Sequence, residues 1–146
     1  MKTQYDFSDS IALAVACAHA IIHKDKEWHG WLSSDPDNFD EEKKLEMSLG
    51  LTRLFNRTKK LISDYDPLLG RTACLVIEKV EASEIVRDND TDGDLFDGRT
   101  IDITLSNNHA EKGKEMRITI FLRNYGEWRI DEIRWFKDKT PMFLEL

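Results

Sequence analysis

Residues 116–137 read MRITIFLRNYGEWRIDEIRWFK, and this stretch has the clearest structural pattern in the chain. Ile118, Ile120 and Leu122 alternate with more polar positions, which is the pattern of a strand with one buried face. Tyr125-Gly126 then predicts a turn, and a second apolar stretch begins directly after it. The segment therefore predicts two consecutive antiparallel strands.

The second of these strands has an irregular apolar pattern. Trp128 and Ile130 stand at even positions, whereas Ile133 and Trp135 stand at odd positions. Because side chains alternate between the two faces of a strand, a regular strand would point these pairs in opposite directions. One extra residue near Asp131-Glu132 returns all four to the same face, so we predict a β-bulge there and a bent sheet.

Two earlier segments also alternate with a period of two. Residues 74–86 are rich in Val and Ile, and residues 99–105 place Ile101, Ile103 and Leu105 on one face. On that strand Asp102 falls on the opposite face, between two threonines. Loops with turn residues are expected at 88–98 and 107–114, so the C-terminal half predicts about four antiparallel strands.

The N-terminal half has helical periodicity instead. Ser8 or Asp9 can cap a first helix, whose apolar face begins at Ile11 and which continues towards Trp28. A second helix is expected to begin at Asp40 and to end by residues 66–70. Its main apolar stripe is expected to comprise Leu45, Leu49, Thr52, Phe55 and Ile62, with a second stripe beside it at Leu51, Leu54 and Leu61.

These elements predict one α+β domain over residues 1–146, with N-terminal helices packed on a curved antiparallel sheet of about four strands. A chain of 146 residues with 40% hydrophobic residues is long enough for one core. The net charge of −7 argues against non-specific binding to nucleic acid. Residues 11–22 form too short an apolar run to cross a membrane, and both cysteines lie among apolar residues, so we expect a cytoplasmic protein.

The terminal hairpin, together with two helices and a return near Lys26-Glu27-Trp28, resembles the nuclear-transport-factor-2-like superfamily, a cystatin-like α+β cone. In that superfamily the last two strands typically read as an alternating strand, a turn, and Trp-Arg-Ile followed by a bulge, here Trp128-Arg129-Ile130. The resemblance implies a curved sheet closed by helices, with a cavity at its open end. Ketosteroid isomerases and dehydratases use that cavity for chemistry, many members only bind, and a bacterial set neutralises toxins as immunity proteins. Fold alone therefore leaves the function open.

Residues 81–97 are strongly acidic, with seven Asp or Glu residues and only Arg87 as a base. A concentrated field of one sign steers a partner of the opposite sign and speeds association. The plainer interpretation is a soluble loop that resists edge-to-edge aggregation. The candidate partner-binding residues are Glu84, Asp88, Asp90, Asp92, Asp94 and Asp97.

The same segment matches the first half of a calcium-binding loop, with oxygen-bearing residues at alternate positions and Gly93 at the sixth. The twelfth position is Arg99 rather than a bidentate Glu, which favours a solvated hairpin loop over a calcium site. His19 and His23 are four residues apart on the first helix, but a zinc site needs a third ligand from elsewhere. We therefore predict no metal and no cofactor.

A small-molecule site is the alternative, using the cavity that the resemblance implies. Its candidate lining residues are Trp28, Trp31, Phe55, Asp102 and Trp128. An apolar cavity would raise the pKa of the Asp102 carboxyl and suit it to proton transfer, but the parity of its strand favours a solvent-facing side chain. Large aromatic residues at such spacings are more often core residues, so we predict no catalytic residue.

The sequence thus favours a non-catalytic, bacterial-type protein-binding domain, and specifically an immunity protein that neutralises a basic toxin domain. The alternative is a small-molecule-binding protein or an isomerase- or dehydratase-like enzyme. No nucleic acid or membrane partner is expected, and the chain is expected to be a monomer or a homodimer.

Overall fold

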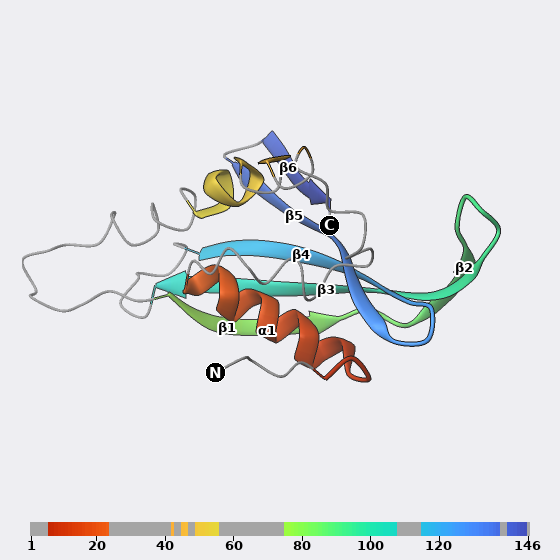
Figure 1. The fold of residues 1–146 in the computed structure, drawn as a ribbon. Coiled ribbons are helices and arrows are strands. Elements are labelled where there is room, and N and C mark those ends of the chain that lie inside the picture. The colour runs from red at the N-terminus through yellow and green to blue at the C-terminus, as the bar shows by residue number, and fades with distance from the viewer. Residues whose placement is uncertain are drawn as a thin grey trace, which may run out of the picture.

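Helices cover one face of an antiparallel sheet in the part of the chain that the structure describes (Figure 1). This computed structural model describes residues 6–23, 42, 45, 46, 49–55, 75–107, 115–137 and 140–145. Helix α1 spans Ser10–Ile22, and residues 49–55 form a second helical segment. The strands are β1 (Leu75–Ala82), β2 (Val86–Asn89), β3 (Leu95–Asn107), β4 (Glu115–Asn124), β5 (Trp128–Lys137) and β6 (Thr140–Glu145). The sheet order is β1-β3-β4-β5-β6, and β2 pairs with β3.

Asp9 begins helix α1. Its Oδ1 accepts hydrogen bonds from the backbone N–H groups of Ile11 and Ala12, at 3.0 and 3.1 Å. These are two of the N–H groups that a helix start leaves without a partner inside the helix. Of the two predicted caps the structure therefore uses Asp9, while Ser8 hydrogen-bonds Asp6. The predicted continuation of the helix towards Trp28 lies outside the described residues.

The apolar face of α1 packs against the sheet. The residues of this face that are fully buried are Leu13, Ala14, Cys17, Ala18 and Ile21. They recur at intervals of three and four residues, as a helix needs in order to present one face. Figure 1 shows α1 crossing the strands diagonally on this side of the sheet.

The second helical segment presents a different stripe from the expected one. Leu51 and Leu54 are fully buried and Phe55 nearly so, whereas Leu45 and Leu49 remain 62% and 52% exposed. Thr52 is exposed as well. The expectation that Leu45, Leu49 and Thr52 face the core is therefore wrong for these positions. Two apolar stripes lie side by side here, and only contact with the sheet selects between them.

The predicted bulge in the terminal hairpin is confirmed. Phe121 on β4 pairs with Glu132 on β5, but the next residue, Leu122, pairs with Ile130. Asp131 is therefore the extra residue that β5 contains at this register shift. As a result the four apolar residues of the shifted pattern share the core face: Trp128, Ile130, Ile133 and Trp135.

The prediction of about four strands is too low, because the structure describes six. Residues 88–98, expected to be a loop, contain the end of β2, a turn and the start of β3. Asp and Asn are poor strand formers, and it is pairing along the long strand β3 that holds β2 extended. Strand β6, with Pro141 inside it, was not predicted either.

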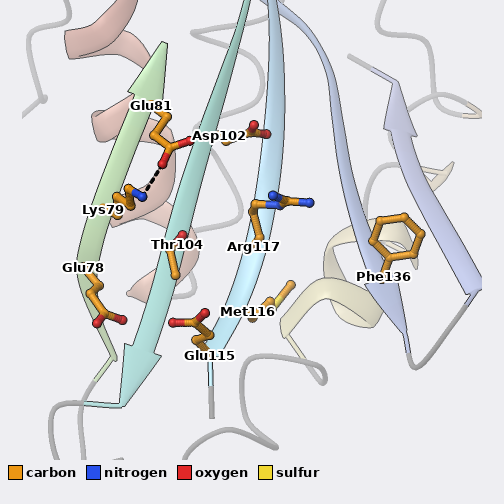
Figure 2. A pocket seen from close by; sticks show the side chains of 9 residues that line it. All are labelled: Glu78, Lys79, Glu81, Asp102, Thr104, Glu115, Met116, Arg117 and Phe136. Carbon is orange, nitrogen blue, oxygen red and sulfur yellow. Dashed lines mark ion pairs between the residues drawn. The ribbon is translucent and has the colours of Figure 1, made fainter. Parts of the chain in front are cut away.

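The two faces of the sheet have opposite character. On one face the alternating residues of β3 and β4 are buried beneath the helices, including Ile101, Ile103, Ile118 and Ile120. On the other face, called the outer face below, most of the intervening residues are polar or charged, and Phe121 is an apolar exception. Figure 2 shows this outer face over β1, β3 and β4, with α1 behind the sheet.

Candidate functional site

The acidic segment forms an arm that extends from one end of the sheet (Figure 1). Strand β2 pairs with the first residues of β3, from Val86 opposite Gly98 to Asn89 opposite Leu95. Every residue of β2 is exposed. Residues 84–98 are called the acidic arm below, and the arm turns at residues 90–94.

Asp90 holds the turn at the tip of the arm together. Its backbone N–H donates to the carbonyl of Asp94 at 2.9 Å, and its own carbonyl accepts from the N–H of Gly93 at 3.0 Å. Its Oδ1 also accepts from the backbone N–H groups of Asp92 and Asp94, both at 2.9 Å. Gly93 has a φ of +84°, which glycine adopts without the steric cost of a side chain. One carboxylate is therefore used to build the turn.

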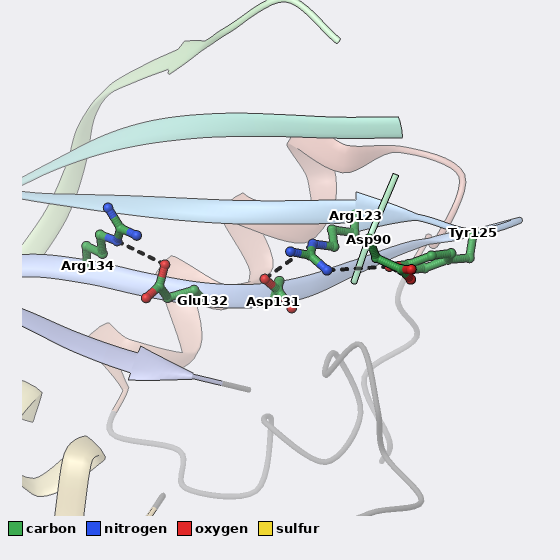
Figure 3. Close-up of polar contacts among 6 residues, drawn as sticks. All are labelled: Asp90, Arg123, Tyr125, Asp131, Glu132 and Arg134. Atoms are coloured by element: carbon green, nitrogen blue, oxygen red, sulfur yellow. Dashed lines mark hydrogen bonds and ion pairs between the residues drawn. The ribbon is translucent and has the colours of Figure 1, made fainter. Parts of the chain in front are cut away.

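Tyr125, in the turn between β4 and β5, braces the tip of the arm (Figure 3). Its hydroxyl donates to Asp90 Oδ2 at 2.8 Å and accepts from Arg123 at 3.4 Å, and Arg123 also pairs with Asp131. The Arg123 guanidinium lies 4.5 Å from the centre of the Phe96 ring. Hydrogen bonds from the Asp94 N–H and then from Tyr125 lower the pKa of the Asp90 carboxyl below its usual value of 3.8. These contacts give the arm a defined orientation.

The predicted partner-binding residues divide into two groups. In the first group the carboxylates already have a partner within the protein. Asp90 accepts the hydrogen bonds of the turn, Asp97 pairs with Arg87 at 3.2 Å, and Asp88 accepts from the N–H of Asn89. The carboxylates that have no hydrogen bond or ion pair within the described part of the chain are those of Glu84, Asp92 and Asp94. All three side chains are exposed, so they are the ones available to a partner.

The arm also exposes large apolar side chains, which the sequence reasoning did not single out. Ile85, Val86 and Leu95 are 51%, 61% and 60% exposed. Protein interfaces commonly combine an apolar centre with a charged rim. Exposed apolar residues among free carboxylates therefore suit a protein surface that is itself basic and partly apolar.

The described residues contain no cluster of metal ligands. Among the described residues no group of three or more His, Cys, Asp or Glu side chains is placed to hold a metal ion. His19 and His23 are both exposed, and their rings stack at a centroid distance of 6.3 Å. Asp90, at the third position of the calcium-loop pattern, accepts the two backbone hydrogen bonds of the turn with Oδ1 and the Tyr125 hydroxyl with Oδ2.

The residues proposed for a small-molecule pocket do not converge. Phe55 and Trp128 are buried in the core between the helices and the sheet. Asp102 lies on the outer face, where its carboxylate accepts from the Thr119 hydroxyl at 2.6 Å. The sheet therefore separates Asp102 from both aromatic residues, as the parity of its strand predicted. Trp28 and Trp31 lie outside the described residues.

The outer face carries an open, mostly polar hollow of about 760 Å³ (Figure 2). Its lining residues include Asp102, Thr104, Glu115 and Arg117, and Lys79 forms an ion pair with Glu81 at its side. Ligand sites are usually enclosed and mostly apolar, with a few converging polar groups. This broad, charged hollow lacks those features.

No helix of the described residues is long and apolar enough to span a membrane.

Comparison of the chain with protein-family models, with curated proteins and with solved structures finds no match.

Proposed function

We propose that this protein is a non-catalytic binding domain that uses the acidic arm to dock onto a basic protein. The observation that carries the proposal is the arrangement of the arm. Three free carboxylates and three exposed apolar side chains lie on a hairpin whose tip is held by the Tyr125–Asp90 hydrogen bond. A surface held in one orientation loses little conformational freedom on binding, which favours affinity.

The more specific proposal is an immunity protein that acts in the bacterial cytoplasm and neutralises a basic toxin domain. Within this proposal the fold belongs to the nuclear-transport-factor-2-like superfamily. The support is the bulge directly after Trp128-Arg129-Ile130 and the helices packed on one face of a bent antiparallel sheet. Many members of that superfamily bind without catalysis, so such a fold would serve as the scaffold from which the arm extends.

Electrostatics gives the arm a role in the rate of binding as well as in its strength. Glu84, Asp92 and Asp94 are exposed, so water and salt screen each of them at equilibrium. Charges at the edge of an interface act mainly on the association rate and on its dependence on salt. We therefore expect the complex to form rapidly at low ionic strength and more slowly as salt is added.

Charge reversal in the arm tests this function. Asp92→Lys together with Asp94→Lys is expected to slow association with the basic toxin domain encoded beside this protein by about tenfold or more at low salt. The matched control is Glu42→Lys with Glu46→Lys, which makes the same change in net charge at exposed helical positions. Stopped-flow or surface-based kinetics measures both double variants.

The control is expected to change the association rate much less than the arm variant does. Equal effects of the two double variants would show that only the net charge matters. A tight complex that the arm variant forms at the wild-type rate would overturn the acidic arm as the docking surface. Asp90 is left intact in both variants because its carboxylate builds the turn.

A further inference from the structure

A second hollow, of about 340 Å³, lies on the outer face where the acidic arm joins the sheet. Its lining residues include Val86 and Asp88 on β2, Phe96 and Gly98 on β3, and Phe121 on β4. A Cβ atom in place of the Gly98 hydrogen would lie 3.2 Å from the Phe96 ring, so glycine lets the ring pack closely onto the strand. The hollow therefore combines apolar walls with charged groups. It is called the arm hollow below.

The protein holds two of its own guanidinium groups at the arm hollow, and it holds both in the same way. Each lies 4.5 Å from the centre of a phenylalanine ring and pairs with a carboxylate of β5. The two sets are Arg123 with Phe96 and Asp131, and Arg134 with Phe121 and Glu132 (Figure 3). An aromatic ring together with a carboxylate is a favourable environment for the flat, delocalised charge of arginine. The chemistry of this hollow therefore suits arginine side chains.

On the arm side of the hollow, two carboxylates pair with no base within the described part of the chain. Glu84 has no hydrogen bond or ion pair there, and Asp88 accepts from the N–H of Asn89 alone. Arg99 also lines the hollow, but its guanidinium donates to a backbone carbonyl and to the Ser10 hydroxyl. An ionised carboxylate can accept several hydrogen bonds, so these two exposed groups can still bind a cation.

We propose that the arm hollow accepts an arginine side chain of the basic partner; this inference rests on the proposed function and deepens it. The guanidinium group pairs with the Glu84 and Asp88 carboxylates, and the methylene groups pack against Val86, which is 61% exposed. The net charge of −7 favours a cationic occupant. Arginine suits the hollow better than lysine because its fork of N–H groups can pair with two carboxylates at once.

Titration with a short arginine peptide tests the arm hollow without the partner. The probe is acetyl-Gly-Arg-Gly-amide at low ionic strength, and its control contains the uncharged isostere citrulline in place of arginine. With the arginine peptide alone, nuclear magnetic resonance is expected to show saturable shifts of the Val86 and Gly98 amide signals, with an affinity in the millimolar range. No saturable shift with the arginine peptide, or equal shifts with the citrulline peptide, would overturn the proposal.

Neutralising the two arm carboxylates tests where the peptide binds. Glu84→Gln together with Asp88→Asn is expected to weaken binding of the arginine peptide by about fivefold or more. The matched control is Glu42→Gln with Glu46→Gln, which makes the same change in net charge at exposed helical positions and is expected to weaken binding by less than about twofold. Equal losses in the two double variants would show a response to net charge and contradict a site in the hollow.

Kinetics with the basic partner separates this inference from the proposed function. Glu84→Gln with Asp88→Asn is expected to speed dissociation of the complex by about fivefold or more, because a side chain held in a hollow prolongs the complex. An unchanged dissociation rate would mean that no partner arginine occupies the hollow. If Asp92→Lys with Asp94→Lys still slowed association in that case, the proposed function would stand and only the present inference would fail.

Discussion

Deletion of Asp131 is expected to unfold the protein or to leave it with little residual stability. Asp131 is the extra residue of the β5 bulge, so its loss restores a regular alternation along the strand. Either Trp128 and Ile130 or Ile133 and Trp135 must then point to the outer face. All four are now buried. Exposing one Trp and one Ile loses about 3–6 kcal/mol of burial, which is comparable to the whole stability of a typical domain.

Asp131→Ala is the matched control for this deletion. It keeps the number of residues, and therefore the bulge, but removes the contact between the carboxylate and Arg123. Partly exposed ion pairs contribute little, so this substitution is expected to cost only about 1 kcal/mol. Urea unfolding followed by tryptophan fluorescence measures both variants. If the deletion were no more destabilising than the substitution, the bulge would not be what places the two tryptophans in the core.

The second large loss of stability is expected from Ile120→Ala. Ile120 is fully buried on β4, in the interior of the sheet, and pairs with Ile101 on β3 and Ile133 on β5. Truncating such a side chain removes apolar burial and leaves a cavity that fixed backbones on both sides cannot close. The expected loss is about 2–5 kcal/mol in the free energy of unfolding. The midpoint of urea unfolding is expected to fall without a change in slope.

Leu49→Ala removes apolar carbons from an exposed position and serves as the comparison. Leu49 is 52% exposed on the second helical segment, so its truncation is expected to change stability by no more than about 0.5 kcal/mol. A loss as large as that of Ile120→Ala would mean that the segment buries the stripe containing Leu45 and Leu49 after all. Chemical denaturation therefore also tests which stripe of this segment faces the sheet.

Sequence periodicity was sufficient to predict the two strands of the terminal hairpin and the bulge in the second of them. The change from even to odd apolar positions between Ile130 and Ile133 has one simple structural solution, a single extra residue, and the structure has it at Asp131. Strand parity also favoured the outer face for Asp102, and capping preferences predicted a helix start at Ser8 or Asp9, of which the structure uses Asp9. These features depend on neighbours within a few residues, so the local sequence contains the information needed to predict them.

Features that depend on distant partners could not be predicted in this way. Strand β2 is rich in Asp and Asn and is extended because it pairs with β3. The division of the acidic residues into structural and free carboxylates depends on Tyr125, which lies 35 residues from Asp90 along the chain. Similarly, only the sheet determines which stripe of the second helical segment is buried. Each of these outcomes is a tertiary contact that leaves no periodic signal.

Hydrogen exchange of the complex with the proposed basic protein partner is the most direct test of recognition by the acidic arm. Every residue of β2 is exposed, so the amides of the arm are expected to exchange faster in the free protein than those of the buried sheet, although Tyr125 holds the tip in place. In the complex we predict that amide exchange slows strongly at residues 84–98 and that exchange in β5 and β6 stays unchanged. A complex that leaves exchange in the arm unaltered and slows it elsewhere would contradict the proposed function.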